Sequence, residues 1–428
     1  MAGPSTDAVT PPGVAWYRTV TPEQWRILAA AKFGWMLDAF DFMIYAQAIG
    51  QISLYFGVGT DITGALGTAT LVMSGVGGLL FGYVADRFGR TRALMATIAL
   101  FSFASLGAAT SATIVQLLFW RALLGLGMGG EWASGAVLVS ETWPASLRNK
   151  AISIMQSGWA IGYALAAVLA AIILVDNSQT NEEWRWLFVV GVLPAFFTLW
   201  IRRNVKEPET WQRRRAEPDT GRNPLAIIFG PALIGRTIRI ILLGGAVQFA
   251  YWGLFFWLPP FLARPVEDGG AGMGVVGQLP WVLLMQCGAY LGYLTFGFIA
   301  DRLGRRQTFV MFMLCAAAIV PIYGQMARNT LVLLTLSPLL GYFGHGYFSM
   351  FGSFIAELFP TAVRATGQGT SYNVGRMAGA VAPYVIGRLA TLPGVGIGLA
   401  MASTSAFFLL AAILVFTLPD RSGQALEA

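Results

Sequence analysis

Two carboxyl side chains lie in the middle of an apolar stretch near the start of the chain. Residues 35–42 read WMLDAFDF, with Asp38 and Asp41 as the only charges. Residues three apart share one face of a helix. A carboxylate at the centre of a bilayer costs about 2.5–3.5 kcal/mol on insertion scales, so such groups face a cavity and handle ions or protons. Desolvation and mutual repulsion favour the neutral form of at least one acid. We therefore expect a proton site here, with a structural ion pair as the alternative.

Arginines supply the opposite charge inside other apolar stretches. Arg376 lies about eleven residues into one of them, and a guanidinium offers a planar fork for a carboxylate. We expect it to anchor a substrate carboxylate, or else to balance an internal acid. Arg121 stays charged in any protein environment and can bias a neighbouring acid toward releasing its proton. Glu131 follows in the same stretch and is a further candidate for titration.

The charges within apolar stretches do not balance. Three acids stand against two arginines: Asp38, Asp41, Glu131, Arg121 and Arg376. One bound proton would balance them, and a substrate carboxylate would make that proton more favourable, which is the outline of symport. His345, the single histidine, titrates near physiological pH in its unperturbed form and is another proton candidate, although hydrogen-bonded packing is the commoner role.

Polar and aromatic side chains recur in the remaining apolar stretches. They offer hydrogen bonds beside apolar surface, which suits a small organic acid better than a bare inorganic ion. Asn373 lies one turn before Arg376 and could orient the acid. Aromatic stripes of membrane helices are mostly packing, so each residue alone remains open. The candidate substrate contacts are Arg376, Asn373, Tyr372, Gln156, Trp159, Tyr163, Gln248, Tyr251, Gln286, Tyr290, Tyr342 and Tyr347.

The elements that hold these residues are predicted membrane helices. Hydrophobic residues make up 56% of the chain and charged residues 11%, with a mean hydropathy of +0.63. Such a composition exceeds what a soluble core can bury, and a membrane span needs about 20 apolar residues. The twelve predicted spans are 27–52, 63–86, 91–110, 113–140, 148–175, 184–203, 235–262, 277–301, 306–325, 330–358, 365–389 and 396–418.

Two motifs occur twice. Residues 82–90 read GYVADRFGR and residues 297–305 read GFIADRLGR, while ETWPASLR at 141–148 recurs as ELFPTAVR at 357–364. Nearly equal offsets for independent motifs indicate a duplication. The predicted parts are a mobile tail at 1–24, a six-helix bundle at 25–203, a linker at 204–234, a second bundle at 235–420 and a tail at 421–428.

The repeated charged loop resembles the signature between helices two and three of the major facilitator superfamily. That resemblance implies an all-α membrane protein with twelve transmembrane helices in two pseudo-symmetric six-helix bundles, which alternate access to a central cavity. It also implies ion-pair latches between the bundles, although purely topological charges are the alternative. The candidate latch residues are Asp86, Arg90, Glu141, Arg148, Asp301, Arg305, Glu357 and Arg364.

The pattern around the paired acids resembles a narrower group, the proton-coupled symporters of sialate, lactate-type and aromatic acids. These usually read Asp-Gly-[Phe/Tyr]-Asp, and Ala39 stands here where glycine is common. The segment GMGGEW at 127–132 has a similar character. We therefore predict proton-coupled symport of a small organic anion. A sugar or zwitterion porter, an exporter, and a membrane nutrient sensor without flux are the alternatives.

The charged residues outside the predicted spans indicate how the protein is oriented in the membrane, and other sequence features argue against other classes of protein. The net charge is +7, and the basic residues cluster in alternate connections, so both termini are predicted to be cytoplasmic. The excess of arginine over lysine hints at a bacterium, hence an inner membrane. Nucleic-acid binding is not expected. No metal cluster, nucleotide motif or catalytic constellation is visible, so we expect no enzyme, no cofactor besides the proton, and a monomer.

Overall fold

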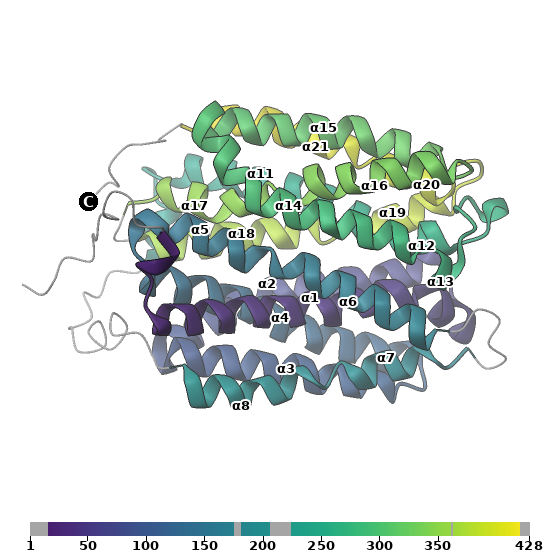
Figure 1. The fold of residues 1–428 in the computed structure, drawn as a ribbon, viewed down its shortest axis with the longest axis horizontal. Coiled ribbons are helices and arrows are strands. Elements are labelled where there is room, and N and C mark those ends of the chain that lie inside the picture. The colour runs from purple at the N-terminus through teal and green to yellow at the C-terminus, as the bar shows by residue number, and fades with distance from the viewer. Residues whose placement is uncertain (1–15, 175–180, 206–223, 361–362, 420–428) are drawn as a thin grey trace, which may run out of the picture.

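The described part of the protein consists of helices joined by short connections. The computed structural model describes residues 16–174, 181–205, 224–360 and 363–419, and no β-strand occurs within these ranges. In Figure 1 the helices run side by side in two groups, purple to teal for the first half of the chain and green to yellow for the second. We call these groups the first and second bundle. The cores of both bundles consist mainly of buried alanine, leucine, isoleucine and aromatic side chains.

The first bundle contains eight helices within the described residues. The helix α1 begins after Thr21, whose hydroxyl accepts from the Gln24 amide in a capping box. Two of the predicted membrane spans are each formed by two consecutive helices: α5 and α6 are separated at Ser157, and α7 and α8 are separated around Gly191. The helices are α1 (Pro22–Phe56), α2 (Thr60–Phe88), α3 (Arg90–Ala109), α4 (Ile114–Thr142), α5 (Ala145–Gln156), α6 (Gly158–Ile173), α7 (Trp184–Val190) and α8 (Pro194–Asn204).

The second bundle has the same plan with more interruptions. A short helix, α10 (Pro224–Ile228), precedes it. Most of the predicted membrane spans in this bundle are formed by two consecutive helices, which are separated by one or two residues. The helices are α11 (Ile234–Phe255), α12 (Leu258–Ala263), α13 (Gly274–Gly277), α14 (Leu279–Leu303), α15 (Arg305–Gln325), α16 (Thr330–His345), α17 (Phe348–Glu357), α18 (Arg364–Gly379), α19 (Ala382–Ala390), α20 (Gly396–Ala402) and α21 (Ser405–Leu414).

Each predicted span coincides with one helix or a consecutive pair of helices. Eight helical stretches of the described chain are long and apolar enough to cross a membrane by length and composition. The helices α1, α4 and α18 are not among these eight stretches, and they carry Asp38, Glu131 and Arg376, respectively. The side chains predicted to do chemistry thus lower the hydropathy of their own helices. The predicted tails and linker lie mostly outside the described residues.

The duplicated motif builds the same turn twice. Gly89 ends α2 with φ 117° and ψ 148°, and Gly304 ends α14 with φ 90° and ψ 145°. Positive φ of this size is accessible to glycine and strained for other residues. Both turns lie at the same end of the molecule, which we call the motif end; the opposite end is the far end. The matching backbone conformations confirm the duplication.

Glycines bring helices of each bundle into backbone contact. A Cβ atom on Gly125 or Gly129 of α4 would overlap the carbonyl oxygens of Thr70 and Ser74 in α2. Small residues at such crossings let membrane helices approach closely. The helices α14 and α16 repeat this arrangement through Gly288, Gly292 and Gly341, which meet the carbonyl oxygens of Pro338, Tyr342 and Met285. The two bundles are therefore built around equivalent helix pairs.

The α2–α4 contact gives a stability prediction. We expect Gly129→Ala to lower the free energy of unfolding by about 1–3 kcal/mol, because the added methyl group has only rigid backbone to displace. Thermal melting of the detergent-solubilised protein measures this. Gly82→Ala on α2 is the matched control, since nothing lies within 4 Å of its Cβ position. Equal melting temperatures for the two variants would contradict the close contact.

Candidate substrate and proton site

A small central cavity lies between the two bundles. Its volume is about 20 Å³. The first bundle contributes side chains from α1, α5 and α6, and the second from α11, α14, α17 and α18. The lining residues are Trp35, Gln156, Trp159, Gln248, Tyr251, Trp252, Tyr293, Phe348, Tyr372 and Arg376. Aromatic rings thus surround a single guanidinium.

Arg376 is a buried guanidinium within this lining. Its side chain is 1% exposed, and Nε, Nη1 and Nη2 have no hydrogen-bond partner among the described residues. The carboxyls of Asp38 and Glu131 lie near enough to interact with it electrostatically. A guanidinium with free donors can bind a carboxylate through two parallel hydrogen bonds.

A hydrogen-bonded group fixes the cavity wall beside Arg376. The Trp252 indole donates to Gln248 Oε1 at 2.9 Å, and the Tyr372 hydroxyl is hydrogen-bonded to the same Gln248 side chain. Tyr372 lies one turn before Arg376 on α18. The wall is therefore held in place by α11 and α18 together, which limits the reorganisation needed on binding.

The paired acids of α1 face different surroundings. Ser105 of α3 donates to Asp41 Oδ1 at 2.6 Å, inside the first bundle. Asp38 instead interacts with Arg376 and Glu131, at the boundary between the bundles. In each acid, Oδ2 is buried and has no partner among the described residues. The spacing of three residues thus places one acid beside the cavity and the other deeper in the first bundle.

Arg121 is enclosed by aromatic rings rather than by acids. Its guanidinium carbon lies 4.3 Å from the Tyr45 ring centroid and 5.4 Å from that of Phe42. Its three side-chain nitrogens make no hydrogen bond to the described residues. Its charge nevertheless acts on Asp41. Cation–π contact of this kind stabilises a desolvated guanidinium, and the neighbouring acid on which Arg121 acts is Asp41.

Glu131 joins the cluster around Arg376. It is fully buried in α4, and neither carboxyl oxygen has a partner among the described residues. Its Oε1 occupies the space where a Cβ atom of Gly34 in α1 would lie. It interacts with both Asp38 and Arg376. Two acids from different helices therefore face the same guanidinium.

His345 lies behind the cavity wall. Its Nδ1 is 3.1 Å from the Gly341 carbonyl oxygen, and its ring centroid is 5.1 Å from that of Tyr251 and 4.1 Å from that of Phe255. It does not line the cavity. The geometry matches the packing role that sequence analysis left open, and the proton role stays a prediction.

Half of the predicted substrate contacts lie elsewhere. Tyr163 donates to the Phe255 carbonyl at 3.1 Å, and Asn373 packs against Gly78 of α2. Outside the lining are Asn373, Tyr163, Gln286, Tyr290, Tyr342 and Tyr347. Four residues line the cavity but are not in the list of candidate contacts: Trp35, Trp252, Tyr293 and Phe348. Only Trp35 carried a signal, since it precedes Asp38 by one helical turn on the same face.

Hydrogen bonds between the bundles close the far end. Thr60 Oγ1 at the start of α2 donates to the Gly387 carbonyl at 3.0 Å. Gln278 Nε2, just before α14, donates to Gln47 Oε1 in α1 at 3.0 Å. The hydrogen bond from Tyr163 to Phe255 also joins the bundles.

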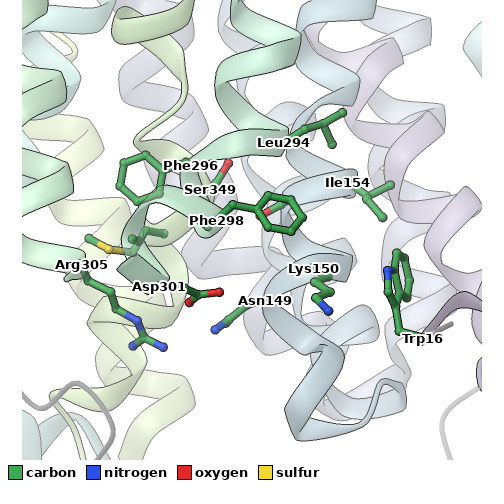
Figure 2. A pocket seen from close by; sticks show the side chains of 14 residues that line it. Trp16, Asn149, Lys150, Ile154, Leu294, Phe296, Phe298, Asp301, Arg305 and Ser349 are labelled. Carbon is green, nitrogen blue, oxygen red and sulfur yellow. The ribbon is translucent and has the colours of Figure 1, made fainter. Parts of the chain in front are cut away.

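A cavity of about 320 Å³ lies at the motif end. Figure 2 shows Lys150 and Trp16 on one side of it and Asp301 and Arg305 on the other. Phe298 lies between them. The cavity is thus lined by α5 of the first bundle and by α14 and α17 of the second.

The predicted latch is only partly within the described residues. The side chains of Asp86, Glu141, Glu357 and Arg364 lie outside them. Arg90 donates to the Ala85 carbonyl at 2.8 Å, which fixes it to its own turn. Arg148 is half-buried, and Asp301 and Arg305 line the motif-end cavity. The latch therefore stays a prediction.

Two helical bundles thus enclose a buried cavity that contains a charged side chain. Residues 33–285 match the model of the Major Facilitator Superfamily. The chain belongs to this superfamily, and it is a multi-pass membrane transporter rather than an enzyme.

Relatives of similar length carry names of organic-acid transporters. A protein of Cupriavidus pinatubonensis named probable 4-methylmuconolactone transporter is 35% identical, over 96% of this chain and 94% of its own. The cis,cis-muconate transport protein of Acinetobacter baylyi is 29% identical, over 90% and 92% of the chains. A sialic acid transporter of Escherichia coli is 28% identical, over 95% and 97%.

A solved structure shares the fold. The crystal structure of a D-xylose–proton symporter superimposes with a TM-score of 0.74, covering 94% of this chain and all of that one. Its sequence identity is 18%. This likeness supports the twelve-helix, two-bundle architecture and says nothing of the substrate.

Proposed function

We propose that this chain is a proton-coupled symporter of a small organic anion. The observation that carries the proposal is Arg376, a buried guanidinium without hydrogen-bond partners among the described residues, in an aromatic-walled cavity between the bundles. A substrate carboxylate would satisfy its donors, and the rings would cover the apolar part of the substrate. The names of the relatives support an organic acid as the substrate class.

Charge balance supports the coupling to protons. Asp38 and Glu131 share the surroundings of Arg376, and binding a substrate carboxylate adds a further negative charge there. Coulomb repulsion between close like charges is large where water is excluded. Protonation of one acid removes that repulsion, so proton and substrate bind together more favourably than either does alone.

The distribution of charge supports an orientation in a bacterial inner membrane. The motif turns carry Arg87, Arg90 and Arg92 in one copy. Arginine-rich connections remain on the cytoplasmic side of a membrane. The motif end is therefore cytoplasmic in this proposal, as are both termini. Hydrogen bonds join the bundles at the far end, and the cavity of about 320 Å³ lies at the motif end, which supports easier access from the cytoplasmic side in this conformation.

A flux assay tests the proposal. Proteoliposomes that contain the purified chain and an internal pH-sensitive dye are given monocarboxylates, aromatic acids or sialic acid. We expect acidification of the interior that depends on an added carboxylate. Liposomes without protein and additions of xylose serve as controls. Uptake of neutral sugars alone, independent of pH, would contradict the proposal.

A further inference from the structure

Two indole groups of the first bundle face the central cavity with unused donors. Trp35 is 6% exposed and Trp159 is 2% exposed, and both line the cavity. Neither Nε1 has a hydrogen-bond partner among the described residues. Their rings lie 4.7 Å apart, centroid to centroid. Most buried polar atoms of proteins are paired, so two neighbouring unpaired donors in one cavity call for an explanation.

A third indole in the same wall shows how such a donor is normally satisfied. The Trp252 indole donates to Gln248 within the protein. No side chain in the described part of the chain does the same for Trp35 or Trp159. The Trp159 indole approaches the Tyr251 hydroxyl of the second bundle, but outside hydrogen-bond geometry. The unsatisfied indole donors thus lie on the side of the cavity formed by the first bundle, while the Arg376 guanidinium and Tyr251 hydroxyl, also unpartnered among the described residues, lie on the other side.

Indole and guanidinium groups donate and cannot accept hydrogen bonds. With Arg376 in the second bundle, the cavity therefore presents donors from both bundles. We propose that the substrate carries, besides its carboxylate, a second carbonyl-type oxygen, and that Trp35 and Trp159 donate to this oxygen. The inference rests on the proposed function, because Arg376 is taken to hold the carboxylate.

Charge selects the kind of second group. Arg376 is the only cation among the residues that line the cavity within the described chain. Asp38 follows Trp35 by one helical turn, and Glu131 interacts with Asp38. A second carboxylate at the indoles would meet these acids, and the ammonium group of Lys32, one turn before Trp35, lies over the Tyr290 ring and is not part of the cavity lining. A neutral ketone, lactone or amide oxygen accepts the same hydrogen bonds without that repulsion.

The position of the two groups gives the second contact a role in the transport cycle. Arg376 lies on α18 of the second bundle, whereas Trp35 and Trp159 lie on α1 and α6 of the first. A substrate with acceptors at both ends would join the bundles. A cavity of about 20 Å³ has room for about one water molecule, so the substrate must enter a more open conformation. Closure around it then depends on both contacts.

Matched ligands test the second acceptor. The probes are 4-acetylbenzoate, its shape-matched 4-isopropylbenzoate and the dicarboxylate terephthalate, with 4-oxopentanoate, 4-methylpentanoate and succinate as a shorter set. Calorimetry with the purified full chain measures their dissociation constants. In at least one set we expect the ketone to bind about two- to tenfold more tightly than its alkyl analogue, the difference made by one neutral hydrogen bond. The dicarboxylate should bind more weakly than the ketone.

Variants assign the preference to the indoles. Each of the variants Trp35→Phe and Trp159→Phe keeps an aromatic ring and removes the donor. The dissociation constant of the alkyl analogue divided by that of the ketone should therefore fall toward one. Trp252→Phe is the matched control, because its donor is already used by Gln248. It should leave the ratio unchanged even if both ligands bind more weakly.

The outcomes separate the two proposals. If no carboxylate of either set binds, the proposed function fails and the second acceptor with it. If carboxylates bind but the ketone has no advantage, or the phenylalanine variants retain it, only the second acceptor is wrong. Tightest binding of a dicarboxylate would overturn the choice of a neutral group.

Discussion

Arg376→Ala should abolish carboxylate binding. Truncating one member of a desolvated, hydrogen-bonded charge pair costs about 2–5 kcal/mol, which corresponds to a loss of at least about thirtyfold in affinity. The expectation follows from the position of Arg376 as the single cation lining the described central cavity. Arg376→Lys should recover little, because an ammonium group lacks the planar fork that binds both carboxylate oxygens. Calorimetry with the purified variants measures both effects.

The chain offers a control for this experiment on the following helix. Arg388 lies on α19 and is exposed, so Arg388→Ala removes the same side chain without changing the cavity. It should bind the carboxylate as the unmodified protein does. Normal binding by Arg376→Ala would instead assign Arg376 as the internal counter-ion of Asp38 and Glu131.

The second large effect is expected at Asp41. Asp41→Asn keeps the size of the side chain and a hydrogen-bonding oxygen for Ser105, but it cannot bind and release a proton. We expect at least a tenfold loss of accumulation driven by an imposed pH gradient, while equilibrium counterflow of substrate continues. Reconstituted vesicles allow both measurements on the same preparation. The ratio of gradient-driven accumulation to equilibrium counterflow should be lower in Asp41→Asn than in the unmodified protein.

Asp38→Asn separates the roles of the two acids. Asp38 interacts with Arg376, so we expect its variant to alter substrate affinity as well as coupling. Because neighbouring acids titrate together, a measured proton affinity belongs to the group rather than to one residue. Glu267→Gln, in the exposed connection between α12 and α13, is the control for loss of an acid. Unimpaired accumulation in the Asp38→Asn/Asp41→Asn double variant would leave Glu131 and His345 as the candidates.

Much of the site was predictable because its components are unusual for their surroundings. Asp38, Asp41, Arg121, Glu131 and Arg376 are charges within apolar helices, where composition alone makes them conspicuous. All five are buried in the structure. The aromatic lining was harder to predict, since aromatic residues occur throughout these helices and most of them pack against lipid or other helices.

The contacts of individual side chains depended on how helices face one another. Tyr163 and Tyr347 have the same chemistry as Tyr251, yet only Tyr251 lines the cavity. Tyr163 instead joins the bundles at the far end. A helical repeat predicts which residues share a face, but it does not give the rotation of that helix relative to its neighbours. That rotation is set by packing.

The sequence by itself determined that this is a duplicated membrane protein with helices at the predicted positions, because local composition and repeated motifs act through each segment alone. It also determined which charges must be compensated. Only the tertiary structure decided how they are compensated. Asp41 accepts a hydrogen bond from Ser105 and interacts electrostatically with Arg121. Asp38 and Glu131 both interact electrostatically with Arg376. The physical reason is that these residues come from α1, α3, α4 and α18, and the close approach of those helices depends on glycine contacts and on the docking of the two bundles.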